Sequence, residues 1–219
     1  MNVSIVIPYY NGWEMTHSLL YDLYRNDKDN ITEVMLVDDA STDTACISGA
    51  SFWKKLLPVR IYRFEENVGF LRASNKGLEK AKGDIKILIS NDVSIKQPFC
   101  QQVIKLLTDN PKQLIGNYFH VTDTGWNKFS DRIFPYLAGY FLGATADTWE
   151  YLEYFDERYA PSDYEDIDLS TKALAEDVKL TSLNLPGIIH IGGQTIKYGA
   201  EREKQTYINK EKFKNKWIT

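Results

Sequence analysis

The chain has 219 residues, with 26 Lys and Arg against 30 Asp and Glu, which gives a formal net charge of −4. This length suits one domain with a sizeable core, and the acidic balance argues against nucleic-acid binding because phosphate neutralisation needs a basic surface. The two cysteines, Cys46 and Cys100, are too few for a disulfide framework or a zinc ribbon, so a reducing, cytoplasmic setting is expected. No apolar run approaches the roughly 20 residues that cross a bilayer, so no integral membrane segment is expected. Aromatic residues make up 13 %, including 14 tyrosines, which indicates a site that stacks on flat or sugar-like ligands.

Strand and helix patterns alternate in the first half of the chain. Apolar runs rich in β-branched residues predict buried strands at residues 3–7, 34–37, 59–64 and 85–89. Stretches with one apolar face predict helices at residues 13–25, 70–82 and from Pro98 onward, with Gly83 as the C-cap of the helix at 70–82. Ser41-Thr42-Asp43 offers N-caps for a further helix that extends through about Leu56. Alternation of this kind predicts parallel β-α-β units joined by right-handed crossovers.

The second half has a different pattern. Residues 116–143 are rich in glycine, aromatic and turn residues, with no clear repeat. Helices are predicted at residues 148–154, 165–175 and 200–219, and extended segments at residues 178–183 and 188–191. No Pro-, Gly- or Ser-rich linker separates the halves, so the sequence predicts a single domain whose second half packs on the same sheet.

Polar residues directly follow the predicted strands, as Tyr9-Tyr10-Asn11, Asp38-Asp39, Glu65-Glu66-Asn67 and Asn91-Asp92. Because the ligand site of a parallel sheet lies beyond the carboxyl ends of its strands, these residues are expected along one edge. Asp92 could hold a divalent cation on a diphosphate, which needs few protein carboxylates, or it could cap a turn. Asp38 and Asp39 could accept hydrogen bonds from a base or a ribose, or form a capping turn before Ser41.

Two further segments carry candidate chemistry. Glu165, Asp166 and Asp168 fall in the first turn of a predicted helix, where acids interact favourably with the helix dipole and where one could serve as a general base. His190 lies in an apolar run, as a core histidine often does, but the glycines at 192 and 193 would let the backbone approach a phosphate, and its neutral imidazole could complete a metal site. The G-x-G-x-x-G, G-x-x-x-x-G-K-[ST] and G-x-S-x-G motifs are absent, so a dinucleotide site, a P-loop and a hydrolase elbow are not supported.

Taken in order, these motifs resemble the family 2 glycosyltransferases with the GT-A fold, particularly the rhamnosyltransferase-like branch. The similarity extends over nearly the whole chain, at residues 3–11, 37–43, 66–70, 75–77, 81–84, 88–93, 155–159, 164–169, 190–194 and 213–217. It implies an α/β GT-A fold with a mostly parallel central sheet flanked by helices, in a single domain of residues 1–219. Within that domain, the resemblance implies a nucleotide-sugar-binding half at residues 1–95, an acceptor-side and catalytic half at residues 96–199, and a helical tail at residues 200–219.

The activity that the resemblance implies is inverting transfer of a sugar from a UDP- or dTDP-sugar to a hydroxyl of a glycan, lipid-linked or protein-linked acceptor. Asp166 would take the proton from that hydroxyl. Glu165 or Asp168 would orient the acceptor or steady the start of the helix. Asp92 and His190 would hold the cofactor, Mn²⁺ or Mg²⁺.

The nucleotide-binding residues that the resemblance implies lie at the strand ends. Tyr10 would stack on the base, and Asp38 and Asp39 would hold the base and the ribose. The other residues of this set are Pro8, Asn11, Asn67, Arg72 and Asn91, with Arg72 as a phosphate partner. The family's metal motif is often Asp-x-Asp, whereas residues 90–92 contain a single carboxylate.

Two other interpretations stay open at this point. A catalytically silent carbohydrate-binding module would also use the many aromatic residues. A sugar-nucleotide nucleotidyltransferase shares the fold but usually carries a Gly-rich, Arg-containing loop after the first strand, which residues 8–12 lack. The lysines of the tail could touch anionic lipid, which leaves peripheral membrane contact open, although the interleaved glutamates favour an ordinary solvated helix face.

Overall fold

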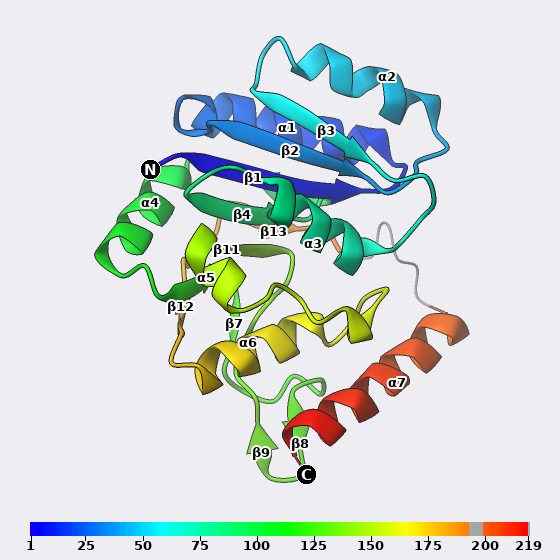
Figure 1. Cartoon of the computed structure of the whole chain (residues 1–219), viewed down its shortest axis with the longest axis vertical. Helices are drawn as coiled ribbons and strands as arrows, with labels where there is room; N and C mark the ends of the chain where they lie inside the picture. The colour runs from blue at the N-terminus through cyan, green and yellow to red at the C-terminus, as the bar shows by residue number, and fades with distance from the viewer. Residues whose placement is uncertain (193–198, 219) are drawn as a thin grey trace.

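A seven-stranded sheet runs through the computed structural model, which describes residues 1–192 and 199–218 (Figure 1). Its strand order is β12-β6-β11-β4-β1-β2-β3. The strands are β1 (Val3–Tyr9), β2 (Glu33–Asp38), β3 (Val59–Arg63), β4 (Ile85–Ile89), β6 (Gln113–Gly116), β11 (Phe141–Thr145) and β12 (Lys179–Ser182). Only β11 runs antiparallel to its neighbours among these seven strands, so the mostly parallel sheet expected from the sequence is confirmed.

Three two-stranded sheets complete the strand set of the described residues. They pair β5 (Val93–Ile95) with β13 (Ile188–His190), β7 (Phe119–His120) with β10 (Tyr136–Leu137), and β8 (Lys128–Phe129) with β9 (Arg132–Ile133). The β5–β13 pair and the β7–β10 pair matter for function, because each ends beside the carboxyl edge of the main sheet, where residues of β7, β13 and the segments next to them line a cleft.

Helices cover both faces of the main sheet (Figure 1). They are α1 (Trp13–Asp27), α2 (Thr44–Trp53), α3 (Phe70–Lys80), α4 (Cys100–Asp109), α5 (Ala146–Tyr151), α6 (Glu165–Ala175) and α7 (Ala200–Trp217), with 3-10 turns η1 (Lys28–Asn30) and η2 (Glu157–Tyr159). No helix within residues 1–192 and 199–218 combines the length and the apolar character that a membrane span requires.

The alternation of side chains along β1 divides the interior into two cores. Ile5 and Ile7 pack in a core with residues of α1, α2 and α4, whereas Val6 packs on the opposite face with residues of α3, α5, α6 and α7. Successive side chains of a strand point to opposite faces of the sheet. Because both faces of this sheet are covered, both sets of side chains are apolar, which explains the continuous apolar run in the sequence. The helices expected at residues 13–25, 70–82, 148–154 and 165–175 are confirmed to within a few residues, as is the terminal helix.

The predicted capping role of Gly83 is wrong. Helix α3 ends at Lys80, and Ala81 is already extended. Gly83 instead allows the chain to pass close to β1, because a Cβ atom there would lie 2.6 Å from the backbone nitrogen of Ser4. The structure also places β7, β8, β9, β10 and the start of β11 within residues 116–143. The sequence shows no repeat there because strands of two to five residues are too short to show a period.

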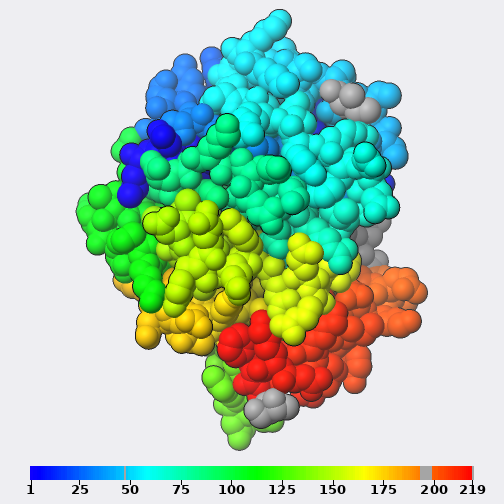
Figure 2. Space-filling model, in the orientation of Figure 1, coloured from blue at the N-terminus to red at the C-terminus, as the bar shows by residue number. Residues whose placement is uncertain are grey.

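Helix α7 packs against the segment that leads into α6, and Figure 2 shows its orange-to-red surface beside the yellow-green surface of that segment. The buried side chain of Asn209 makes this contact specific. Its amide nitrogen donates to the carbonyl oxygens of Tyr159, Ser162 and Asp163 at 2.7, 2.8 and 2.9 Å. The tail therefore holds a loop that borders the cleft described below.

Candidate functional site

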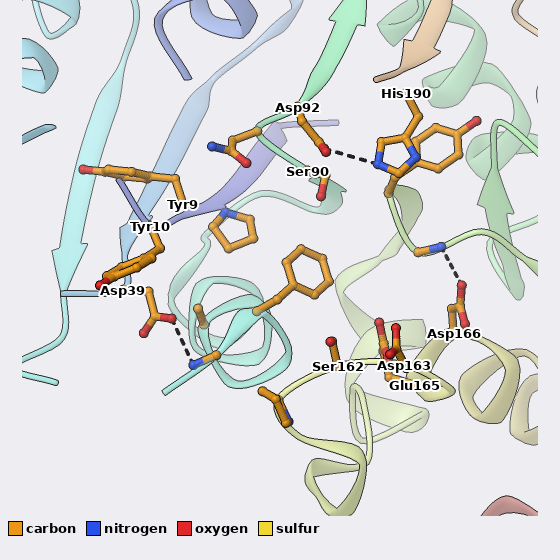
Figure 3. A pocket seen from close by; sticks show the side chains of 18 of the residues that line it. Tyr9, Tyr10, Asp39, Ser90, Asp92, Ser162, Asp163, Glu165, Asp166 and His190 are labelled. Carbon is orange, nitrogen blue, oxygen red and sulfur yellow. Dashed lines mark hydrogen bonds and ion pairs between the residues drawn. The ribbon is translucent and has the colours of Figure 1, made fainter. Parts of the chain in front are cut away.

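A cleft of about 750 Å³ lies at the carboxyl ends of β1, β2 and β4 (Figure 3). The loop before α6 and the segment between β10 and β11 form its other side. Nine of the thirteen site residues expected from the sequence line it, namely Pro8, Tyr10, Asp39, Asn67, Asn91, Asp92, Glu165, Asp166 and His190. Asn11, Asp38, Arg72 and Asp168 are not part of its lining.

Asp92 and His190 face each other across one end of the cleft (Figure 3). Oδ1 of Asp92 is buried, accepts no hydrogen bond from the described residues and lies 3.3 Å from Nε2 of His190. The backbones are held together because His190 pairs with Val93 across the β5–β13 ladder and Ile191 donates to the carbonyl of Asp92 at 3.0 Å. The imidazole stacks on Tyr140, with ring centroids 4.5 Å apart and planes at 14°, and remains about one third exposed, so it is no core histidine.

A buried carboxylate oxygen that accepts no hydrogen bond from the described residues, beside an imidazole, fits a divalent cation. Within the described residues, no group of three His, Cys, Asp or Glu side chains could hold a metal by itself. Hard cations accept such sparse protein coordination when phosphate oxygens and water supply the remaining ligands. Asp92 and His190 therefore suit a cation that arrives together with a phosphorylated ligand.

Asp166 lies at the part of the cleft formed by α6 and the segment between β10 and β11, where backbone donors hold its carboxylate. Its Oδ2 accepts from the nitrogen of Gly139 at 3.0 Å, and its Oδ1 accepts from the nitrogen of Ile167 at 2.8 Å. Burial raises the pKa of Asp166 to about 6, and the charge of Asp163 adds to the rise while the two backbone hydrogen bonds oppose it. A carboxyl group with this pKa is mostly ionised at pH 7 and can still accept a proton, as a general base must.

Glu165 presents a second carboxyl group at this end. It is 7 % exposed, and its Oε2 is buried without a partner among the described residues. Burial, together with the charge of Asp166, raises the pKa of Glu165 well above its ordinary value. The two residues that precede it, Asp163 and Tyr164, have positive φ values of 75° and 74°, a conformation that bulky residues rarely adopt.

The nucleotide side of the cleft is built around Asp39. Its carboxylate accepts from the backbone nitrogens of Val68 and Gly69 at 2.7 and 2.9 Å, just before α3 begins. Burial raises the pKa of Asp39, and these two hydrogen bonds oppose the rise. Asn67 donates to the carbonyl of Asp39 at 3.3 Å, so the ends of β2 and β3 are joined across the cleft floor.

Asp38 and Asn11 lie outside the cleft lining because their side chains hold backbone instead. Asp38 is 2 % exposed, accepts from the nitrogen of Ser41 at 2.8 Å and forms an ion pair with Arg63. Asp38 thus forms the turn before Ser41 that the sequence left open as the alternative for one of the two aspartates, whereas the cap of α2 is Asp43. The side-chain oxygen of Asn11 accepts hydrogen bonds from the backbone nitrogens of Thr42 and Asp43 at 2.9 and 3.0 Å.

Arg72 and Asp168 also lie away from the expected ligands. The half-exposed guanidinium of Arg72 pairs with Glu157 at 3.4 Å rather than facing the cleft. Asp168 is 1 % exposed, and its carboxylate accepts from Lys216 and Trp217 of α7 at 2.8 and 2.7 Å. Of its two expected roles, this placement matches support of the helix start and does not match contact with an acceptor.

Several lining residues were not foreseen from the sequence, among them His120, Gly139, Tyr140, Asp163 and Arg202. Arg202 of α7 pairs with Asp163 at 2.9 Å and so connects the tail to the cleft. The segment that contains the first three showed no periodic pattern, although its richness in glycine and aromatic residues was visible. Gly193 and Gln194, the end of the late His-Gly motif, lie outside the described residues.

The sequence profile of glycosyl transferase family 2 matches residues 4–167. Among curated proteins, the chain is similar to the glycosyltransferase GlyG of Streptococcus pneumoniae, with 26 % identity over 57 % of this chain and 42 % of that protein. It is also similar to the putative glycosyltransferase EpsH of Bacillus subtilis, with 29 % identity over 59 % of this chain and 37 % of that protein. The chain thus matches less than half the length of either relative.

Solved structures share the architecture. TarS of S. aureus in complex with UDP-GlcNAc aligns with a TM-score of 0.72 and 18 % identity over 95 % of this chain and 64 % of that chain. GalNAc-T7 with UDP, GalNAc and Mn²⁺ aligns with a TM-score of 0.75 and 14 % identity over 99 % of this chain and 48 % of that chain. The mannosyltransferase PcManGT from Pyrobaculum calidifontis, in complex with GDP-Man and Mn²⁺, aligns with a TM-score of 0.64 and 21 % identity over 83 % of this chain and 54 % of that chain. At these identities the similarity concerns the fold, and it confirms the expected GT-A architecture.

Proposed function

We propose that this chain, which belongs to glycosyl transferase family 2, moves a sugar from a nucleoside diphosphate donor to an acceptor hydroxyl with inversion at the anomeric carbon. The observation that carries the proposal is the meeting of Asp92 and Asp166 in one cleft. Asp92 follows β4 and Asp166 lies in the first turn of α6, so the two carboxylates come from separate halves of the chain. One lies where a diphosphate and its cation would be held, and the other lies where an acceptor would be deprotonated.

The donor nucleotide would occupy the side of the cleft formed by the strand ends. Tyr10 offers a ring for the base, and Pro8, Asn67 and Asn91 line the same side. We assign a uridine or thymidine diphosphate sugar as the donor. The complexes of TarS with UDP-GlcNAc and of GalNAc-T7 with UDP support this choice, whereas the GDP-Man complex of PcManGT makes a guanosine donor the alternative to test.

The charge of the cleft supports a cation-dependent donor site. Among the described residues, five carboxylate side chains line the cleft: Asp39, Asp92, Asp163, Glu165 and Asp166. Arg202 also lines it, but its guanidinium is paired with Asp163. A diphosphate would be repelled by this excess of negative charge. Asp92 and His190 would hold Mn²⁺ or Mg²⁺, which supplies Lewis-acid neutralisation of the departing diphosphate. The Mn²⁺ in the GalNAc-T7 and PcManGT structures agrees with this assignment.

Asp166 would act as the general base. The acceptor oxygen forms a bond to the anomeric carbon while the bond from that carbon to the phosphate oxygen breaks, and the acceptor proton passes to Asp166. Attack on the face opposite the leaving group inverts the anomeric centre. The backbone nitrogens of Gly139 and Ile167 orient the carboxylate, and a positioned base contributes roughly 10² to 10⁴ in rate. Glu165 would contact the acceptor, and Asp168 would be a positioning residue that joins α6 to α7.

The test measures donor binding separately from turnover. Thermal unfolding with UDP-, dTDP- and GDP-sugars, each with and without Mn²⁺ or Mg²⁺, should show a metal-dependent rise of the melting temperature for one donor, because a ligand of the native state at 100 times its Kd adds about 2.7 kcal/mol. Asp92→Asn and His190→Ala should reduce the metal-dependent part of the rise. Asp166→Asn should keep donor binding and lose nucleotide release. If none of the nucleotide sugars raises the melting temperature in a metal-dependent manner, the donor site is refuted. If the wild type binds a donor but shows no turnover, the transferase assignment is refuted.

A further inference from the structure

Three aromatic rings pack against one another in a row beside the cleft. In the β7–β10 pair, His120 lies opposite Tyr136, and their rings are stacked with centroids 4.5 Å apart and planes at 14°. Tyr118 meets His120 edge-on, with centroids again 4.5 Å apart and planes at 74°. Tyr118, His120 and Tyr136 are called the aromatic platform below. His120 lines the cleft, and Tyr118 is 56 % exposed, so the platform runs from the cleft to the molecular surface.

The platform adjoins the end of the cleft that contains Asp166. The backbone nitrogen of Ala138 donates to the carbonyl of Tyr118 at 3.0 Å, and the next residue, Gly139, donates to Oδ2 of Asp166 at 3.0 Å. Burial raises the pKa of Tyr136 to about 12, and the negative charge of Asp166 is the next largest cause. One short segment after β10 therefore connects the platform to the carboxylate.

The chemistry of this surface suits a sugar ring. Burial lowers the pKa of His120, so its imidazole is neutral at pH 7 and adds an uncharged ring to the lining of the cleft. Aromatic faces bind apolar C–H surfaces, and a carbohydrate ring offers such a surface on one side and hydroxyl groups around its edge. Oε2 of Glu165, buried without a partner among the described residues, lies at the same end of the cleft and would pair with one of those hydroxyls.

The outer ring, Tyr118, is accessible to a ligand. Core aromatic residues of this protein, such as Phe141 and Trp149, are fully buried, whereas more than half of the Tyr118 side chain is open to solvent. Resting on the glycosyl transfer proposed above, we infer that the acceptor is a saccharide. Its terminal ring lies against Tyr118 and His120 and presents a hydroxyl to Asp166. Tyr118 is then a binding residue for the acceptor and makes no contact with the donor.

The inference is tested by direct binding rather than by turnover. Saturation-transfer NMR with methyl glycosides of glucose, galactose, N-acetylglucosamine, N-acetylgalactosamine and rhamnose, in the presence of UDP and Mn²⁺, should reveal a bound saccharide. Tyr118→Ala should weaken its Kd about tenfold, the effect of one lost aromatic contact, and Tyr118→Phe should retain it within about twofold. Tyr21→Ala is the matched control, because Tyr21 is 49 % exposed on α1 and does not line the cleft. His120→Phe should retain binding that His120→Ala loses.

The outcomes separate this inference from the proposed function. If nucleotide sugars with Mn²⁺ stabilise wild type and Tyr118→Ala equally, but no saccharide binds or Tyr118→Ala binds it as tightly as the wild type, the acceptor inference is wrong and the donor site stands. If Ser- and Thr-containing peptides bind in a Tyr118-dependent manner and saccharides do not, the acceptor is of another class. If no nucleotide sugar binds any variant, the proposed function itself fails.

Discussion

Replacement of Asp166 by Asn should stabilise the protein at neutral pH while removing its chemistry. Burial raises the pKa of this carboxyl from 3.8 to about 6. Keeping it ionised at pH 7 therefore costs the folded state about 3 kcal/mol, since each pKa unit corresponds to about 1.4 kcal/mol. Asparagine removes this cost, but its single carbonyl oxygen can replace only one of the acceptors for Gly139 and Ile167, which loses about 1 kcal/mol. The net gain expected at pH 7 is about 2 kcal/mol.

The sign of the pH dependence makes this prediction specific. Between about pH 4 and pH 6 the folded state binds more protons at Asp166 than the unfolded state does, so the contribution of Asp166 to stability falls as pH rises. At pH 4 the carboxyl group of Asp166 is largely protonated in the folded state, so most of the cost of its ionisation is gone and the lost hydrogen bond outweighs the remainder. The variant should therefore be slightly less stable than the wild type at pH 4 and more stable at pH 7.

Thermal and urea unfolding of both proteins at pH 4 to 8 measures the difference directly. A gain of about 2 kcal/mol corresponds to a melting temperature about 4 to 8 °C higher at pH 7 for a chain of this size. Asp131→Asn, at an exposed carboxylate between β8 and β9, is the control and should show no such pH-dependent gain. A difference that stays constant with pH, or a variant less stable at pH 7, would refute the argument that a desolvated, ionised carboxylate occupies the cleft.

Activity of the same variant completes the experiment. Nucleotide release on acceptor addition should fall about 10² to 10⁴-fold, the contribution of a positioned general base. In the wild type, the rate should decline below a midpoint near pH 6, to about a tenth of its plateau at pH 5. Equal turnover in wild type and variant would show that another group accepts the proton.

Three further substitutions test the framework around the cleft. Asn209→Leu should lower the free energy of unfolding by about 2 to 3 kcal/mol in urea unfolding, because two buried carbonyl groups and one half-buried carbonyl group lose their donor. Gly83→Ala should cost about 1 to 3 kcal/mol by overpacking against the backbone of Ser4, whereas Gly199→Ala, where a Cβ meets no described atom within 4 Å, should change stability little. Arg72→Ala should leave the Kd for nucleotide sugars unchanged in calorimetry, because its guanidinium is paired outside the cleft, and a large loss of affinity would show that it reaches the phosphates.

The candidate site was partly predictable because the strand ends were visible in the sequence. Asp39 and Asp92 follow apolar runs whose carboxyl ends must meet at one edge of a parallel sheet. Residue type alone could not show whether Asp38 or Asp39 faces the cleft, because both are aspartates. It is the last residue of β2 and lies in register with Arg63 on β3, so its side chain points away from the cleft and forms an ion pair. Neighbouring strand residues face opposite sides, and only the register shows which side holds the ligand.

Local pattern determined the alternating strands and helices of the first half, the start of α6 and the acids that begin it, since periodicity and capping are properties of a few neighbouring residues. The tertiary structure decided which of those acids share a space. It directs Asp166 into the cleft and buries Asp168 against α7, and it brings Tyr118 and His120 to the same end. These placements depend on contacts between residues far apart in the chain. A single sequence lists the residues but does not show which distant ones are in contact.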